Sequence, residues 1–206
     1  MPPMKLYTTP GTCSLACHIA LYDTGVPFEA ETVNLRDKTT ADGADFRTIN
    51  PKGSVPALEM AHGQVLTEGV AIMQYAVDSV GGAGVAPAVG TVERARMQEA
   101  LNFIAGELHK GGYGPLFRPG LTDEQKQAQF AVIDTKLDWL EGLMADGRDS
   151  LVTGGHTLAD SYLFTIAGWS RNFGHDLSKF PKIMALRERV AARPAVQAAM
   201  RAEGMV

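Results

Sequence analysis

Cys13 is the residue of this chain that its local sequence best equips for nucleophilic chemistry. It follows Pro10 and Gly11, where a short apolar strand is predicted to give way to an amphipathic helix. The first N–H groups of a helix and the positive end of its dipole stabilise a thiolate at such a position. A lone cysteine is otherwise most often a small buried hydrophobic residue. The segment alone therefore leaves both interpretations open.

Cys17 follows Cys13 at helical i,i+4 spacing. Their Cα atoms would lie roughly 6 Å apart, but the Cβ vectors of such a pair run nearly parallel, so a disulfide between them would be strained. The spacing also differs from the Cys-x-x-Cys of a dithiol oxidoreductase. We therefore predict that Cys17 is a packed residue of the helix.

Two further segments have the groups that would recognise an extended, charged ligand. Val55 precedes Pro56 before a predicted strand, and a cis bond there would leave backbone groups free to form a short β-bridge with a peptide. Glu68 and Gly69 open a predicted helix, where free N–H groups suit a carboxylate and Glu68 suits an ammonium group. Together they would bind the head group of an α-amino acid. Each also fits a simpler interpretation, a trans proline and an ordinary helix start.

The elements that must position these residues fall into two groups. Strand and helix patterns alternate in the first part of the chain, which is typical of a small α/β domain with one sheet. Residues 82–90 are rich in glycine, alanine and proline and are predicted to be a linker between a domain at 1–81 and one at 91–206. Helical spacing dominates the second domain, at 91–111, 123–146, 157–172, 180–192 and 194–203. Thr157-Leu-Ala-Asp160 has the form of a capping box at a helix start.

Composition excludes several classes of protein. The 206 residues are 45% hydrophobic and 20% charged, as in ordinary globular proteins. A net charge of −4 argues against a general nucleic-acid binder. We expect no membrane span, no signal region before the first strand and, with two cysteines, no disulfide framework, so the cytoplasm is the expected compartment. No spacing of histidines and cysteines predicts a metal site.

Other residues that could take part in chemistry have simpler explanations. Glu107-Leu-His109-Lys110 ends the first long helical pattern, where a cation is favoured but is usually solvated. Trp139 and Trp169 lie on helical faces and are predicted to belong to the core.

Taken together and in order, these motifs resemble the glutathione S-transferase family, most closely its bacterial beta class, over nearly the whole chain. The segments that carry the resemblance are Pro10-Gly-Thr-Cys13-Ser-Leu-Ala, Asn50-Pro-Lys-Gly-Ser-Val55-Pro56-Ala-Leu, Leu66-Thr-Glu68-Gly69-Val-Ala-Ile-Met-Gln-Tyr, Glu107-Leu-His109-Lys110 and Pro115-Leu-Phe-Arg-Pro119. The resemblance implies a thioredoxin-like N-terminal domain, an all-helical C-terminal domain and a homodimer, with glutathione bound in the cleft between the domains.

The resemblance also implies roles for residues of the first domain. Cys13 corresponds to the cysteine that faces the glutathione sulfur. Val55, before a cis Pro56, corresponds to the backbone partner of the cysteinyl unit. Glu68 and Gly69 match the pair that holds the γ-glutamyl end.

Five further positions match family residues that contact or approach the ligand. Lys38 matches a lysine near the glycyl carboxylate, and His109 and Lys110 match groups that reach in from the helical domain. Asn102 and Glu107 match positions that approach the ligand of the partner subunit.

Two positions depart from the family pattern. The family often has serine where Gly69 stands, so one hydroxyl contact to the γ-glutamyl carboxylate is absent. Many transferases carry a tyrosine on the first strand where this chain has Thr8. Tyr7 is predicted to face the other side of the sheet, so it is not expected to activate the thiol.

The resemblance predicts an enzyme that conjugates the thiol of glutathione, its co-substrate, to small hydrophobic electrophiles, with no further cofactor. The helix dipole, the Cys13 region and His109 would stabilise the glutathione thiolate. The electrophile would bind near Tyr113, Phe117 and Trp169, although these aromatic residues also fit a core. Two alternatives remain: a thiol-disulfide oxidoreductase or peroxidase in which Cys13 forms a mixed disulfide with glutathione, and a non-catalytic protein that binds glutathione or hydrophobic ligands.

Overall fold

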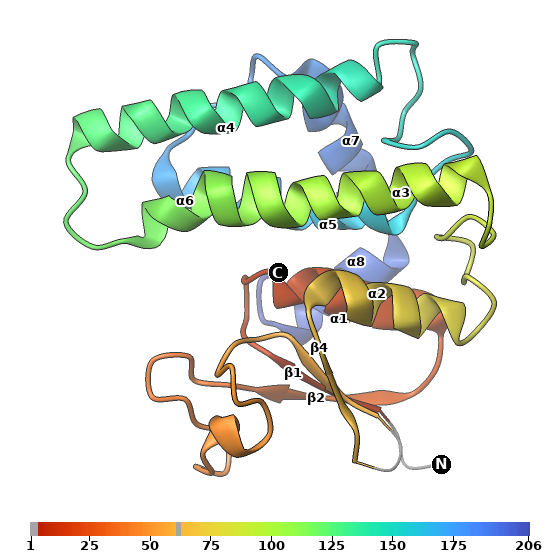
Figure 1. The fold of residues 1–206 in the computed structure, drawn as a ribbon, viewed down its shortest axis with the longest axis vertical. Coiled ribbons are helices and arrows are strands. Elements are labelled where there is room, and N and C mark those ends of the chain that lie inside the picture. Colours follow the sequence, from red (N-terminus) through yellow and green to blue (C-terminus); the bar gives the residue numbers. More distant parts are fainter. Residues whose placement is uncertain (1–3, 61–62) are drawn as a thin grey trace. The chain divides into compact units, whose positions relative to one another are not determined.

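The computed structural model describes residues 4–60 and 63–206, and the chain divides into two compact units (Figure 1). The first unit combines Met1–Val85 with Arg193–Val206, and the second comprises Ala86–Ala192. The boundaries expected from the linker, 1–81, 82–90 and 91–206, remain a prediction. The structure groups the C-terminal helix with the first unit because it packs there against the first helix of the chain.

A four-stranded mixed sheet forms the centre of the first unit, as the thioredoxin-like prediction requires. Its strands are β1 (Met4–Thr8), β2 (Phe28–Thr32), β3 (Ala57–Glu59) and β4 (Val65–Thr67), in the order β2-β1-β3-β4. β1 pairs with β2 in parallel, whereas β1–β3 and β3–β4 are antiparallel. The parallel pair needs a crossover connection, which the first helix supplies.

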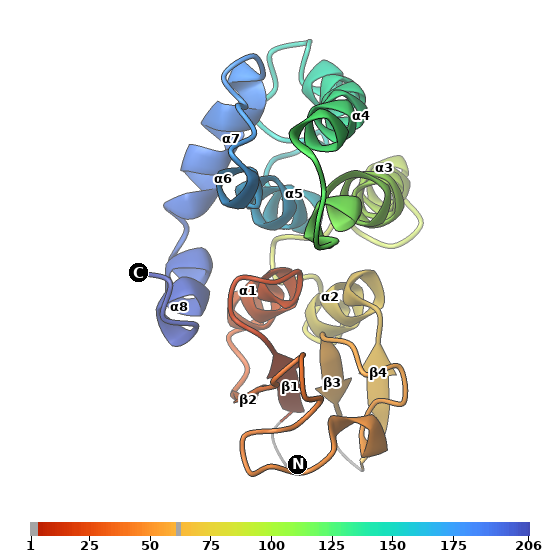
Figure 2. The same cartoon turned by 90° about the vertical axis from the view of Figure 1, so that its left-hand side faces the viewer.

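Helices α1 (Ser14–Thr24) and α2 (Gly69–Asp78) cover one face of this sheet, and α8 (Pro194–Ala202) lies beside α1 (Figure 2). The helix predicted to follow the turn at Pro10 and Gly11 is confirmed. Gly25 ends it with a φ of +67°, a left-handed conformation in which glycine has no Cβ to clash. α2 begins at Gly69 with Glu68 as its N-cap, at the helix start predicted for this pair.

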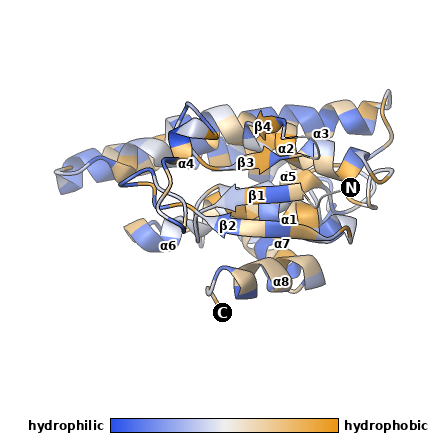
Figure 3. Cartoon of the chain, turned by 90° about the horizontal axis from the view of Figure 1, so that it is seen from below, coloured by the Kyte–Doolittle hydropathy of each residue, from blue (hydrophilic) through white to orange (hydrophobic). Residues whose placement is uncertain are grey.

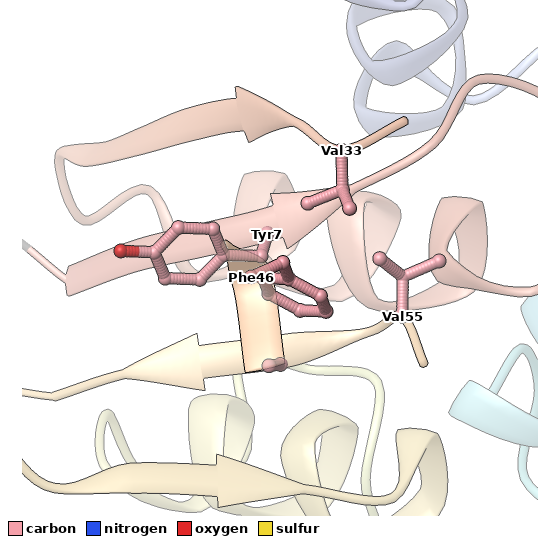
Figure 4. Packing of buried hydrophobic residues seen from close by; sticks show 5 residues of the cluster. Tyr7, Val33, Phe46 and Val55 are labelled. Atoms are coloured by element: carbon pink, nitrogen blue, oxygen red, sulfur yellow. The ribbon is translucent and has the colours of Figure 1, made fainter. Parts of the chain in front are cut away.

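The opposite face of the sheet carries a small aromatic and aliphatic cluster under the segment that holds the short helix η1 (Phe46–Thr48) (Figure 4). Tyr7 packs against Phe46 with the ring centroids 5.5 Å apart, while Val33, Val55 and Ala57 complete the cluster. The Tyr7 hydroxyl donates to Glu59, 2.9 Å away, and burial together with this hydrogen bond raises the pKa of Tyr7 to about 12. Tyr7 therefore lies on the face of the sheet predicted for it. The edge strand β2, with its two glutamates, is more hydrophilic than β4 (Figure 3).

The second unit is helical throughout. Its elements are α3 (Val92–Phe103), the π-helix η2 (Ile104–Tyr113), η3 (Gly114–Phe117), α4 (Asp123–Leu143), α5 (Leu158–Gly168), α6 (Ser170–Phe173) and α7 (Pro181–Ala191). α5 packs against α3, η2 and α7 (Figure 2). The predicted capping box at Thr157 and Asp160 is present at the start of α5. Among the described residues, no helix has both the length and the apolar character to cross a bilayer.

The structure differs from the sequence patterns at three places in this unit. The first helix does not stay α-helical to residue 111 but widens into η2. Added Cβ atoms at Gly111, Gly112 and Gly114 would lie 3.2–3.3 Å from the carbonyl oxygens five residues earlier, so this wide turn favours glycine. The helix predicted at 157–172 is divided at Trp169 into α5 and α6. Trp139 is 37% exposed and packs on Phe103, so its predicted place in the core was wrong.

Candidate functional site

Cys13 lies at the N-cap of α1 and is half-buried. Its Sγ donates a long hydrogen bond to the carbonyl oxygen of Val55, 3.7 Å away. Cys17 is fully buried, and its Sγ donates to the carbonyl oxygen of Gly69 at 3.4 Å. Burial, and next the charge of Cys13, raises the pKa of the Cys17 thiol well above its usual value. The prediction that Cys17 is a packed helix residue is therefore confirmed.

The loop before Cys13 is tied to the C-terminal end of the chain by the buried carboxylate of Glu203. Its Oε2 accepts from the backbone N–H of Gly11 at 2.9 Å, and its Oε1 accepts from the Thr8 hydroxyl at 3.2 Å. Nδ1 of buried His18 lies 3.0 Å from the same Oε1. One carboxylate thus holds groups from β1, the loop and α1.

Ser14 holds the same loop from the helix side. Its Oγ accepts from the backbone N–H of Thr9 at 3.1 Å. It also lies within hydrogen-bond distance of the hydroxyl oxygens of Thr8, at 2.7 Å, and Thr12, at 2.8 Å. These contacts and those of Glu203 determine the path of the backbone into α1, and with it the position of Cys13.

The segment Lys52–Pro56 contacts every first-unit residue that the sequence marks for ligand binding. Its Val55 carbonyl faces Cys13, and its Gly53 carbonyl accepts from Nζ of Lys38 at 2.9 Å. The Lys52 ammonium pairs with Glu68 at 2.6 Å, and Pro56 lies 3.7 Å from where a Cβ on Gly69 would stand. The Val55–Pro56 bond is cis, as the resemblance implies. The structure therefore brings these residues to one end of the sheet, where β3, α1 and α2 begin.

Glu68 has an unusual backbone conformation at the start of α2. Its φ is +72° and its ψ is 115°, a combination that residues with a Cβ rarely adopt. Such strain is retained mainly where a functional geometry requires it. Its side chain is exposed and ion-paired with Lys52, which adds little to stability because both groups remain in water. Lys52 was not singled out from the sequence, although it lies within a motif that carries the resemblance.

In the second unit, His109 points into the interior from the π-helix η2. It is 9% exposed, and its Nδ1 lies 3.1 Å from the hydroxyl oxygen of Tyr162 on α5. Burial, and next the positive charge of Lys110, lower the pKa of His109 to about 4. The imidazole is therefore neutral near pH 7, so it acts through hydrogen bonds rather than as a cation.

The other predicted residues of this unit lie on the surface of α3 and η2. Asn102 donates to the carbonyl oxygen of Gln98 at 2.9 Å, within its own helix. Glu107 forms an ion pair with Lys136 of α4 at 2.5 Å, and Lys110 is exposed. Buried and exposed side chains alternate here because successive residues of η2 point in different directions: His109 points inward, and Glu107 and Lys110 point outward. π-Helical turns of this kind are frequent at functional sites.

The three aromatic residues expected near an electrophile do lie together. The ring of Phe117 meets that of Trp169 edge-on, with the centroids 5.1 Å apart, and Tyr113 meets Trp169 at 6.3 Å. Trp169 also contacts His109, at 5.0 Å. Tyr113 and Trp169 are buried, whereas Phe117 is 56% exposed. The cluster is thus largely core, with one aromatic face open to solvent.

Comparison with known proteins gives the same family for both units. The model of the glutathione S-transferase N-terminal domain matches residues 2–78, and that of the C-terminal domain matches residues 93–194. Glutathione S-transferase GstA of Escherichia coli O157:H7 is 42% identical over 203 residues, which cover 98% of this chain and 100% of the relative.

Solved structures agree closely. A sphingomonad glutathione S-transferase complexed with glutathione superposes with a TM-score of 0.91 at 42% identity, and covers 98% of this chain and 100% of its own. The bacterial beta class glutathione S-transferase of Sphingomonas chungbukensis gives the same values. By motif, fold and full-length similarity, this chain belongs to the glutathione S-transferase family, within its bacterial beta class.

Proposed function

We propose that this protein conjugates the thiol of glutathione to small hydrophobic electrophiles. The observation that carries the proposal is the convergence on Lys52–Pro56 of a cysteine, a lysine, a glutamate and a helix N-terminus. These groups are complementary to a thiol, a carboxylate, an ammonium group and a second carboxylate. These four groups are the ones carried by a γ-glutamyl tripeptide whose central residue is cysteine.

In this proposal the peptide backbone of glutathione bridges Val55, next to Pro56. Glu68 binds the α-ammonium group, while the N–H groups at Gly69 bind the γ-glutamyl carboxylate. Lys38 serves the glycyl carboxylate. Full-length relatives that are glutathione S-transferases, one of them solved with glutathione bound, support this assignment.

The chemical role proposed for the protein is to raise the thiolate fraction of bound glutathione. The N-terminal end of α1 favours negative charge, and the Cys13 thiol can donate a weak hydrogen bond to the sulfur. His109 and Lys110 of the second unit would act on the same sulfur and its surroundings. A neutral His109 would contribute an N–H donor.

We further propose that the electrophile binds beside Tyr113, Phe117 and Trp169, and that the protein is a homodimer in which Asn102 and Glu107 approach the ligand of the partner subunit. A cytoplasmic location fits the two free cysteines, since disulfides are rare in reducing compartments. Size-exclusion chromatography with light scattering tests the dimer.

Replacing Cys13 with alanine tests the proposal against its redox alternative. We expect kcat/KM for conjugation to a chloronitrobenzene to fall by about fivefold, the effect of one weak hydrogen bond, with conjugation retained. His109→Ala should reduce conjugation more. If Cys13 were instead the nucleophile of a thiol-disulfide exchange, Cys13→Ala would abolish reduction of a glutathione mixed disulfide. Undiminished conjugation in both variants would remove these residues from the mechanism.

Replacing Gly69 with serine should tighten glutathione binding. An added Cβ would lie 3.6 Å from Sγ of Cys17 and 3.7 Å from Pro56, which is ordinary van der Waals contact, so the side chain fits. Its hydroxyl would add a donor for the γ-glutamyl carboxylate, and we expect Kd to fall by about fivefold in titration calorimetry. Gly69→Ala adds the same Cβ without the hydroxyl and should leave Kd unchanged. Equal affinities of the two variants would contradict the proposed contact.

A further inference from the structure

The contact between His109 and Tyr162 joins two buried side chains from separate helical elements. Nδ1 of His109 and the hydroxyl oxygen of Tyr162 lie 3.1 Å apart, although the two residues are 53 positions apart in the chain. Tyr162 is 4% exposed and His109 9%. Their rings meet at 85°, with the centroids 6.4 Å apart, so the hydroxyl approaches the edge of the imidazole.

A neutral imidazole has one nitrogen that donates a hydrogen bond and one that accepts. His109 is in this neutral form near pH 7, because burial and the charge of Lys110 lower its pKa to about 4. The nitrogen that carries the proton is decided by the hydrogen bond that the other nitrogen makes. For His109 that bond is the one between Nδ1 and Tyr162.

The direction of this hydrogen bond follows from acidity. A phenol hydroxyl is a much stronger acid than the N–H of a neutral imidazole, which favours donation from the hydroxyl of Tyr162 to Nδ1 of His109. The single imidazole proton then belongs to Nε2. The edge-on contact of His109 with Trp169, at 5.0 Å and 77°, holds the plane of the ring at the same time.

We propose that Tyr162 is a positioning residue of the transferase reaction: its hydrogen bond to Nδ1 keeps the imidazole proton of His109 on Nε2, where it can be donated to the glutathione sulfur. This inference rests on the proposed function. A thiolate is stabilised by a donor and destabilised by a lone pair, so the other tautomer of His109 would oppose the reaction. In this role Tyr162 acts through its hydrogen bond to His109.

A double-mutant cycle separates this role from a merely structural one. Tyr162→Phe removes the hydroxyl and keeps the ring, and we expect kcat at saturating glutathione to fall by roughly tenfold. His109→Gln places an amide N–H near the position of Nε2. Because an amide has no tautomers of this kind, glutamine can donate from there without the help of Tyr162. In that background, Tyr162→Phe should change kcat by less than about twofold. Equal losses in the two backgrounds would overturn the proposal.

Nitrogen NMR of protein labelled at histidine gives a second readout that needs no catalysis. In the wild type, the spectrum of His109 should show a protonated Nε2 and an unprotonated Nδ1, and Tyr162→Phe should give a mixture of both tautomers. A protonated Nδ1 in the wild type would overturn the proposal. If the wild type conjugates glutathione to no electrophile, the proposed function fails, and the nitrogen spectrum still decides the tautomer. Tyr22→Phe, at an exposed position on α1, is the control for loss of a tyrosine hydroxyl.

Discussion

Replacing Glu203 with alanine should lower the free energy of unfolding by about 3–5 kcal/mol, a large effect for a residue three positions before Val206. The buried carboxylate accepts from the Gly11 N–H and the Thr8 hydroxyl and pairs with His18. Alanine leaves these groups without their acceptor, and an unsatisfied buried polar group costs about 1–3 kcal/mol. Urea unfolding followed by far-ultraviolet circular dichroism measures the change.

The same substitution should make Cys13 more reactive, because the loop before it loses its bond between Gly11 and Glu203. We expect faster reaction with an aromatic disulfide reagent in native conditions. Arg201→Ala, at an exposed position in the last turn of α8, should change stability by no more than about 0.5 kcal/mol. A Glu203→Ala protein as stable as the Arg201→Ala control would show that the carboxylate does not hold the loop.

Replacing Asp160 with alanine should destabilise the second unit by about 2–4 kcal/mol. The carboxylate of Asp160 accepts from the backbone N–H of Thr157 at 2.6 Å, from the Thr157 hydroxyl at 3.0 Å and from the backbone N–H of Leu151 at 2.8 Å. All three residues are buried, so no water replaces the lost acceptor. The capping box that starts α5 therefore also holds the loop before it. Urea unfolding compares the variant with the wild type.

The difference in free energy of unfolding between the wild type and Asp160→Ala should decrease as pH rises. Burial, opposed by the hydrogen bonds to Leu151 and Thr157, raises the pKa of Asp160 to about 6, above the value of about 3.9 for an unfolded aspartate. Between these values the folded protein binds a proton that the unfolded chain has lost, so the stabilisation is full below pH 4 and decreases as pH rises through 6. The stability lost in Asp160→Ala should therefore be larger at pH 5 than at pH 7.5.

Asp123→Ala is the matched control for Asp160. Asp123 lies in the first turn of α4, but its side chain is almost fully exposed and pairs with Lys126. Its loss should cost no more than about 0.5 kcal/mol at either pH. If Asp123→Ala and Asp160→Ala were equally destabilised, or if their difference did not change with pH, the buried capping contact would not have the energy assigned to it.

Much of the fold could be predicted because its signals are local. The bounds of α1 follow from an apolar strand, a turn with Pro10 and Gly11, and Gly25 at the end. The capping box at Thr157 and Asp160 is a four-residue pattern. These features need only neighbouring residues, so periodicity and helix-end chemistry reveal them.

The widening of the first helix into η2 could not be predicted from its apolar spacing. Its only local signal is the set of glycines from Gly111 to Gly114, which relieve crowding by carbonyl oxygens five residues earlier. The position of α8 was equally hidden. Its helical pattern continues that of the second unit, but Arg193–Val206 belong with the first, because Val196 and Ala199 are buried and α8 packs against α1.

The sequence by itself determined the family, the elements and the residue types of the site, because ordered motifs and short-range periodicity are written along the chain. It placed Cys13 at a helix start and Glu68 and Gly69 at another, and the structure agrees. Only the tertiary structure decided what holds these groups. Glu203 reaches Gly11 across 192 residues and Tyr162 reaches His109 across 53, and no local period encodes such partners. Such contacts exist only after the chain has packed, because a buried polar group must find its hydrogen-bond partners within the protein.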